Sequence, residues 1–261
     1  MKKFFATAVT ALLIVLSLVL YVNISFSRLR VTPFYDDCVK VWSHAGHSRE
    51  YEINSLPGYR QALDLGAGGV ELDVHYDLGT DRFIVSHDFP YQKRDGRLLE
   101  LEEVMDELAG RGYFWLDFKN LKRMKINEAE KAARRLSDLI QRYKLNNRVI
   151  VESKNALNLA VFSRAGIPSS YWVNVNRNKE GLETKLRVFS FKAMFLYGRF
   201  SAVSMDHRNY TPYLQEAFKN LPVHLFTINS EEEILEHMYR ENVKVILSDE
   251  NFFGLDGCAR Q

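Results

Sequence analysis

Two carboxylates and an imidazole alternate along one short apolar stretch, GGVELDVHYD, at residues 68–77. Because successive side chains of a strand point to opposite faces, Glu71, Asp73 and His75 would share one face, and three aliphatic side chains the other. Carboxylate oxygens are preferred ligands of hard cations such as Mg2+ and Ca2+. The stretch therefore predicts a strand with one face in a core and the other face able to bind a metal ion.

A third carboxylate, Asp117, lies in the similar apolar stretch YFWLDFKN at residues 113–120. If the two stretches are neighbouring strands, Asp117 can converge with Glu71 and Asp73. Such an all-oxygen set suits one divalent cation, Mg2+ or Ca2+, better than zinc or copper.

Two histidines and a lysine accompany these carboxylates in strand-like segments: His44, His87 and Lys119. An imidazole with its ordinary pKa of about 6.5 is suited to proton transfer at neutral pH. A cation, a lysine and two histidines can together stabilise an anionic phosphoryl transition state and move two protons. The predicted chemistry is metal-assisted cleavage at phosphorus.

Eight strand-like segments can position these residues, and a ninth, 82–88, can form a hairpin with the second. The eight are residues 39–46, 68–76, 113–120, 148–153, 171–176, 201–207, 223–229 and 243–249. Eight strands, each followed by a helical segment, predict an α/β fold of the TIM-type (β/α)8 barrel class, whose catalytic groups lie at the carboxyl ends of the strands. An open doubly wound sheet is the alternative, but no glycine-rich loop follows the first strand.

Helix boundaries are indicated by capping residues between these strands. Ser55 is positioned to cap a helix that ends at Gly66, and the pairs Asn127–Glu130 and Ser230–Glu233 have capping-box spacing. We also expect a helix with breaks over residues 178–200.

The first 30 residues form a separate unit, with Lys2 and Lys3 followed by no charge until Arg28. The apolar run is nearer the length of a membrane span than of a secretory signal, and the two lysines favour a cytoplasmic N-terminus. We therefore expect residues 1–30 to be a signal anchor, with a cleaved signal peptide as the alternative. Residues 31–261 would form the barrel on the periplasmic or extracellular side, secreted if the segment is cleaved.

Composition and cysteine content limit the classes of partner. The 261 residues are 46% hydrophobic and carry 35 basic against 33 acidic groups, so nothing indicates nucleic-acid binding.

The two cysteines, Cys38 and Cys258, lie near the two ends of the exported part. They are either a disulfide, as an oxidising compartment permits, or two free thiols.

Residues 43–90 resemble the opening of the glycerophosphodiester phosphodiesterase superfamily. The matching positions occur in the family's order and at similar spacing: His44, Asn54, Ser55, Gly66, Glu71, Asp73, His87 and Asp88. The later stretches WLDFKN, VHLFTIN and VILSDEN are similar to further strands of the family, with Phe226 where the family has tryptophan.

The resemblance implies a barrel enzyme that acts on a glycerophosphodiester or a lysophospholipid-type phosphodiester in lipid metabolism. It implies Glu71, Asp73 and Asp117 as metal ligands, and His44 and His87 as acid–base groups. Lys119 would contact the phosphate. Either water or a neighbouring hydroxyl of the substrate would attack.

The chain departs from the family pattern at several positions. Ala45 replaces the family's arginine, and Arg49 or His47 could supply that phosphate contact. Asp117 stands where glycerophosphodiesterases usually have Glu, which is closer to the sphingomyelinase D and lysophospholipase D branch. Loss of the arginine leaves open an alternative function, a membrane-tethered barrel that binds a phosphorylated ligand or a partner without turnover.

Several other polar residues are candidates for the pocket wall: His75, Glu152, Asn229 and Asp249. By contrast, we expect His224 to be structural and Trp42, Trp115 and Trp172 to serve in packing.

Overall fold

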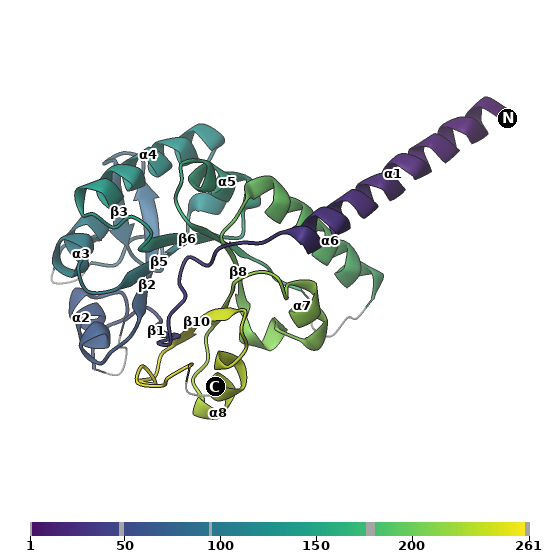
Figure 1. The fold of residues 1–261 in the computed structure, drawn as a ribbon. Helices are drawn as coiled ribbons and strands as arrows, with labels where there is room; N and C mark the ends of the chain where they lie inside the picture. Colours follow the sequence, from purple (N-terminus) through teal and green to yellow (C-terminus); the bar gives the residue numbers. More distant parts are fainter. Residues whose placement is uncertain (1, 47–49, 94–95, 176–180, 259–261) are drawn as a thin grey trace.

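The computed structural model describes residues 2–46, 50–93, 96–175 and 181–258, and its centre is a closed parallel barrel (Figure 1). Closure is complete because β1 pairs with both β10 and β2. The predicted barrel is therefore confirmed, and the alternative prediction of an open doubly wound sheet is wrong. The eight barrel strands are β1 (Val41–Ser43), β2 (Gly69–Asp77), β5 (Tyr113–Phe118), β6 (Val149–Ser153), β7 (Ser169–Trp172), β8 (Ala202–Asp206), β9 (Val223–Phe226) and β10 (Val243–Ser248).

The helices other than α1 surround the barrel, and the full set of helices is as follows (Figure 1). They are α1 (Lys2–Arg28), α2 (Leu56–Asp64), α3 (Leu101–Leu108), α4 (Ile126–Arg142), α5 (Ala156–Arg164), α6 (Leu182–Gly198), α7 (Pro212–Ala217) and α8 (Glu231–Met238), with the short 3-10 helices η1 (Leu121–Arg123) and η2 (His207–Asn209). Of these, α3, α5 and α7 were expected only as helical segments after strands, without predicted bounds.

The predicted caps agree with the structure only in part. Ser55 does cap α2, because its hydroxyl accepts from the backbone N–H of Gly58 at 3.3 Å. The prediction for α4 is wrong: its cap is Lys125, whose backbone N–H donates to the Glu128 carboxylate at 2.8 Å. Ser230 holds the cap position of α8 without a side-chain hydrogen bond. Over the described part of 178–200, α6 is continuous, so the predicted breaks are absent there.

The predicted hairpin is present, because β3 (Arg82–Val85) pairs antiparallel with β2. A further two-residue strand that the sequence did not predict, β4 (Leu99–Glu100), pairs with β3. The hairpin turns the chain back over the barrel mouth, where the backbone N–H of Ser86 donates to the Asp73 carbonyl at 2.9 Å. His87 is thereby held beside the end of β2.

Two separate apolar clusters stabilise this architecture. The larger one lies between the barrel and its helices, and the smaller one fills the barrel interior around Trp42 and Trp115. Both tryptophans therefore pack as expected. Gly69 makes room for Trp42, since a Cβ at Gly69 would approach that indole to 2.7 Å.

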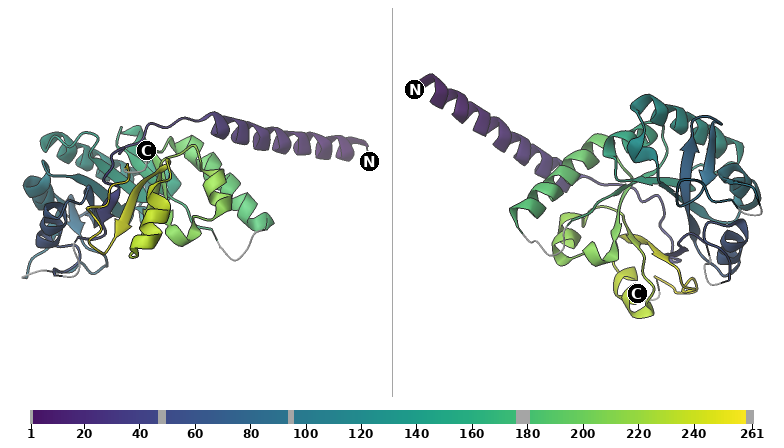
Figure 2. Two further views of the ribbon diagram at one scale, coloured as in Figure 1. Left: turned by 60° about the horizontal axis from the view of Figure 1, so that its bottom comes forward. Right: turned by 180° about the vertical axis from the view of Figure 1, so that it is seen from behind.

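The N-terminal helix α1 projects from the barrel, and its C-terminal end lies against α6 (Figure 1, Figure 2). Its part Val9–Arg28 is long and apolar enough to cross a membrane. The last turn belongs to the globular core, because Phe26 is 3% exposed and packs edge-on against Phe195 and Phe218.

A disulfide joins Cys38 and Cys258, whose Cα atoms are 5.1 Å apart and whose sequence separation is 220. Of the two alternatives left open by the sequence, the structure has the bridge. It ties the segment that enters β1 to the segment that leaves β10.

Reduction of this disulfide is expected to lower the melting temperature by about 10 °C or more. A crosslink that closes so long a loop restricts the unfolded chain and contributes on the order of 5 kcal/mol. Circular dichroism of the full chain in detergent, with and without dithiothreitol, measures the effect. The Cys38→Ser, Cys258→Ser double variant should have the melting temperature of the reduced wild type and should not respond to dithiothreitol. Equal melting temperatures for the oxidised, reduced and variant proteins would contradict the prediction.

Candidate active site

Strand register brings the acidic side chains together at the carboxyl ends of three adjacent strands. Asp73 of β2 pairs in register with Asp117 of β5, which pairs with Glu152 of β6. Glu71 lies two residues earlier on β2 and so points to the same side. These four carboxyl groups therefore lie together at the barrel mouth, three of them at one level.

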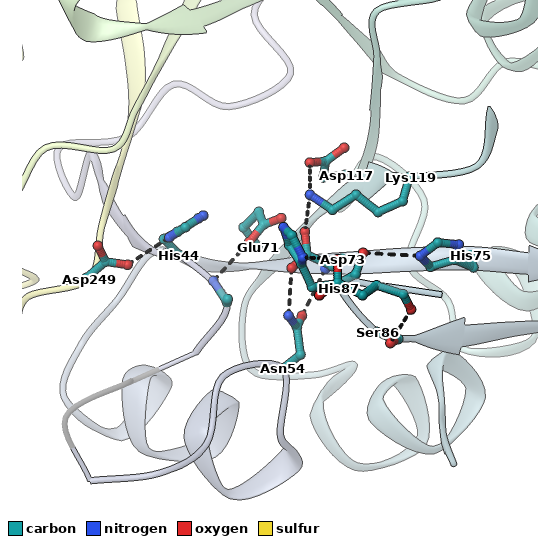
Figure 3. Close-up of polar contacts among 12 residues, drawn as sticks. His44, Asn54, Glu71, Asp73, His75, Ser86, His87, Asp117, Lys119 and Asp249 are labelled. Atoms are coloured by element: carbon teal, nitrogen blue, oxygen red, sulfur yellow. Dashed lines mark hydrogen bonds and ion pairs between the residues drawn. The ribbon is translucent and has the colours of Figure 1, made fainter. Parts of the chain in front are cut away.

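Three of these carboxylates form a compact cluster: oxygens of Glu71, Asp73 and Asp117 all lie within 4.8 Å of one another. Lys119 Nζ lies 2.5 Å from Asp73 Oδ1 and 2.5 Å from Asp117 Oδ2. The backbone N–H of Ala45 donates to Glu71 Oε2 at 2.9 Å. Figure 3 shows the cluster with Lys119 on one side of Asp73 and Asn54 on the other.

Asn54 fixes the orientation of Asp73 through both ends of its amide. Its Nδ2 donates to Asp73 Oδ2 at 2.6 Å, and its Oδ1 accepts from the Asp73 backbone N–H at 3.0 Å. The Tyr59 hydroxyl donates to the same Oδ1 at 2.8 Å. Asn54 is itself fully buried, so Asp73 is held in one position.

The cluster carries more negative charge than its one lysine can compensate. Burial and the charge of Asp73 raise the pKa of Glu71 well above its ordinary value, and burial also raises the pKa of Asp117. Burial would raise the pKa of Asp73 as well, but the charge and hydrogen bond of Lys119 and the bond from Asn54 lower it. A convergent, under-neutralised set of oxygens fits a hard divalent cation, which would supply the missing positive charge.

His44 stands at the edge of this cluster, between Asp249 and Glu71 (Figure 3). Its Nδ1 lies 2.7 Å from Asp249 Oδ1, and since a carboxylate only accepts, Nδ1 carries the hydrogen. Burial lowers the pKa of His44, but the bond to Asp249 and the charge of Glu71 outweigh this and raise it to about 9. The imidazole is therefore protonated at neutral pH.

Asn229 in turn holds Asp249 rather than facing the cluster. Its Nδ2 donates to Asp249 Oδ2 at 2.7 Å, and its Oδ1 accepts from the Asp249 backbone N–H at 2.9 Å. His44, Asp249 and Asn229 thus form a chain of contacts across the closing strands of the barrel.

His87 and His75 lie on the hairpin side of the cluster. His87 is exposed, and its Nδ1 lies 2.9 Å from Asp88 Oδ1, which leaves Nε2 open to a ligand. His75 is buried, with Nε2 3.3 Å from the His87 backbone carbonyl, and burial lowers its pKa. Neutral His75 therefore supports the position of His87.

Glu152 lies at the same level as Asp117, 2% exposed. Its Oε2 has no hydrogen-bond partner among the residues that the structure describes. Burial and the charge of Asp117 raise its pKa well above the ordinary value. Glu152 thus lines the site beside Asp117, where burial disfavours its charged form.

A cavity of about 650 Å3 opens from the cluster toward the hairpin and the loop after β5. His87, Asp117 and Lys119 line its inner end, and Trp172 lines its wall. Trp172 thus borders the cavity, beyond the packing role that the sequence suggested. His224, in contrast, is fully buried in the barrel against Trp115, and burial lowers its pKa to about 3.

Nine of the ten predicted site residues lie at this end of the barrel, and Arg49, like His47, falls outside the described residues. Sequence reasoning missed the partnership of His44 with Asp249 and the hold of Asn54 on Asp73. The contact of Asn54 with Asp73 could have been anticipated, because Asn54 matches a family position, but the sequence analysis gave it no role. No local pattern indicated the contact of His44 with Asp249, because the two residues lie 205 positions apart in the sequence.

No family model and no curated protein matches the sequence. Solved structures do match. A glycerophosphodiester phosphodiesterase from Thermotoga maritima is 20% identical, with a TM-score of 0.62 over 82% of this chain and 95% of that one. One from Parabacteroides distasonis is 18% identical, with a TM-score of 0.62 over 82% and 94%.

A third structure, an Oleispira antarctica phosphodiesterase in complex with the product sn-glycerol-3-phosphate, is 16% identical, with a TM-score of 0.62 over 83% of this chain and 94% of that one. At these identities and TM-scores, the similarity indicates a shared fold. Together with the closed barrel, they confirm the predicted resemblance at the level of the fold. The chain therefore has the fold of the glycerophosphodiester phosphodiesterase superfamily.

Proposed function

We propose that this protein is a metal-dependent phosphodiesterase that acts on glycerophosphodiesters or on lysophospholipid-type phosphodiesters. The observation that carries the proposal is the cluster of Glu71, Asp73 and Asp117 within 4.8 Å, at the mouth of a barrel shared with phosphodiesterases. These carboxylates would hold one Mg2+ or Ca2+ ion, which would supply positive charge to the phosphate oxygens.

The lysine and the two histidines have complementary roles in this proposal. Lys119, fixed between Asp73 and Asp117, presents its ammonium group to the phosphate. His44, protonated at neutral pH, donates its Nε2 proton to the departing alkoxide. His87 accepts the proton of the attacking hydroxyl, either water or a hydroxyl of the substrate.

Replacement of Asp249 by asparagine is expected to move the alkaline limb of the pH–rate profile to lower pH. Without the carboxylate, the pKa of His44 falls from about 9 toward its ordinary value. His44 then loses its proton at lower pH, by roughly one unit or more. Initial rates between pH 6 and 10 test this, with exposed Asp138→Asn as the control, and an unmoved limb would exclude His44 as the acid.

The assay for the function itself uses the full chain in detergent with glycerophosphocholine or lysophosphatidylcholine, each with Mg2+, Ca2+ or EDTA. Phosphorus NMR identifies the products. Cleavage that EDTA abolishes supports the proposal, and the better substrate separates the glycerophosphodiesterase from the phospholipase D-type reaction. A cyclic phosphate would identify attack by the substrate's own hydroxyl. No turnover, with a divalent ion still raising the melting temperature, would favour the alternative of a tethered binding protein.

The packing of α1 supports a retained membrane anchor over a cleaved signal peptide. In the alternative of a cleaved signal peptide, the small residue Ser27 is a suitable cleavage position, and a cut after it would remove Phe26 from its contacts with Phe195 and Phe218. It would also remove the Ser27 carbonyl that accepts from Asn220 Nδ2 at 3.1 Å. We therefore propose that residues 1–30 are the anchor and that residues 31–261 form the barrel outside the cytoplasm. The end of the anchor segment packs against the barrel domain. Mass spectrometry of the membrane fraction would show whether the N-terminal residues remain.

A further inference from the structure

Beside the candidate metal site lies a basic surface that the proposed chemistry does not use. The cavity of about 650 Å3 extends from Asp117 to three further cationic side chains: Lys122, Arg123 and Lys154. Among the residues that the structure describes, no carboxylate forms an ion pair with any of the three.

The backbone that carries Lys122 and Arg123 is firmly held. Buried Asn158 donates through Nδ2 to the carbonyls of Leu121 and Met124, at 2.7 and 2.8 Å, on either side of the two cations. Asn120 exchanges two hydrogen bonds with the backbone of Tyr76, at 3.1 and 2.9 Å. The two cations of η1 therefore extend from a fixed loop at the cavity wall.

Lys154 follows the end of the neighbouring strand, β6, and faces the same space. Its Nζ lies 3.3 Å from the centre of the Trp172 ring. Burial and repulsion by the charge of Lys122 lower the pKa of Lys154, and the charges of Asp117 and Glu152 oppose this in part. The cation–π contact offsets part of this repulsion and occupies one face of the aromatic ring.

The three acidic residues on the cavity wall have other partners, and that of Asp117 is Lys119. Asp88 accepts from His87 Nδ1 at 2.9 Å, and Glu128 accepts from the Lys125 backbone N–H at 2.8 Å. Three cations that line one cavity, with no ion pair to a carboxylate among the described residues, are a complementary surface for an anionic ligand.

We propose that Lys122, Arg123 and Lys154 bind a second anionic group, a phosphomonoester or a carboxylate, on the alcohol portion of the phosphodiester. This inference rests on the proposed function and narrows its substrate class. The phosphodiester itself lies at the carboxylate cluster, and the second anion lies across the cavity. A choline headgroup carries no second anion and would make no use of this subsite, so the choline compounds test the phosphodiesterase alone.

The test compares two compounds that differ by one phosphate group, glycerophosphoinositol 4-phosphate and glycerophosphoinositol, with the full chain in detergent and Mg2+. A charge-assisted contact typically changes an equilibrium about tenfold or more, so we expect at least a tenfold higher kcat/KM for the phosphorylated compound. The Lys122→Gln, Lys154→Gln double variant should lose that advantage. Its kcat/KM for glycerophosphoinositol should stay within about twofold of the wild-type value. Lys185→Gln on α6 is the matched control. Lysophosphatidylinositol 4-phosphate shows whether the anion belongs to a soluble or an acylated substrate.

Calorimetric titration with the same pair separates this inference from the proposed function. If the phosphorylated compound binds with a lower Kd but neither compound is hydrolysed, the anionic subsite is supported and the proposed phosphodiesterase activity is rejected. Equal kcat/KM and Kd values for the two compounds would overturn the subsite and leave the phosphodiesterase intact. An equal loss on both substrates in the double variant would also overturn it.

Discussion

Replacement of Glu71 by glutamine is expected to reduce turnover at least about 100-fold and, at the same time, to stabilise the metal-free protein. Mutation of groups that merely support metal ligands already costs about 10–100-fold, so loss of a ligand should exceed that range. Glutamine keeps the size of the side chain and an oxygen that can accept from the Ala45 backbone N–H.

The stability effect follows from the sign of the pKa shift. Burial and the charge of Asp73 raise the pKa of Glu71 in the folded state, so the ionised carboxylate opposes folding at neutral pH. Removing the charge therefore raises the melting temperature without metal, and the further rise on adding Mg2+ or Ca2+ should disappear.

Thermal unfolding with EDTA and with each ion, alongside the phosphorus NMR assay, measures both effects. Glu130→Gln, on the exposed face of α4, is the matched control and should behave as the wild type. A Glu71→Gln variant that keeps its activity and its response to Mg2+ would exclude Glu71 as a metal ligand.

Alanine at His44 or His87 is expected to lower kcat by roughly 100- to 10,000-fold, the usual contribution of a positioned proton-transfer group. Both side chains are partly or fully exposed, so their loss should leave the fold intact. His237→Gln on α8 serves as a histidine control away from the barrel mouth.

The two alanine variants should differ with an activated substrate. A p-nitrophenyl ester releases a stable phenolate that needs no proton, so His44→Ala should recover much of its rate with that ester and His87→Ala should not. The reverse pattern would exchange the acid and base assignments. Equal residual rates of the two variants on both substrates would show that neither histidine transfers the proton to the leaving group.

Much of the barrel could be predicted from local sequence because its determinants are local. Alternation of apolar and polar side chains has a period of two residues, so the stretch at residues 68–77 indicates β2 and its polar face without any tertiary information. The shorter elements escaped prediction because a two-residue strand such as β4 carries too few positions to show a period.

The cap of α4 shows the limit of such local rules. Both Asn127–Glu130 and Lys125–Glu128 present a Glu three residues after a candidate cap, and the buried faces of Ala129, Ala132 and Leu136 decide which helix start fits the barrel. Packing of the helix therefore overrides the better intrinsic capping residue.

The sequence by itself determined the eight strands, the polar residues at their carboxyl ends, and so the composition of a carboxylate and histidine site. Only the tertiary structure decided which of those residues touch. The contact of His44 with Asp249 and the Cys38–Cys258 bridge join segments from the two ends of the barrel, so both depend on barrel closure. Strand register fixes these contacts, and register arises from the packing of all the strands together rather than from spacing along any one of them.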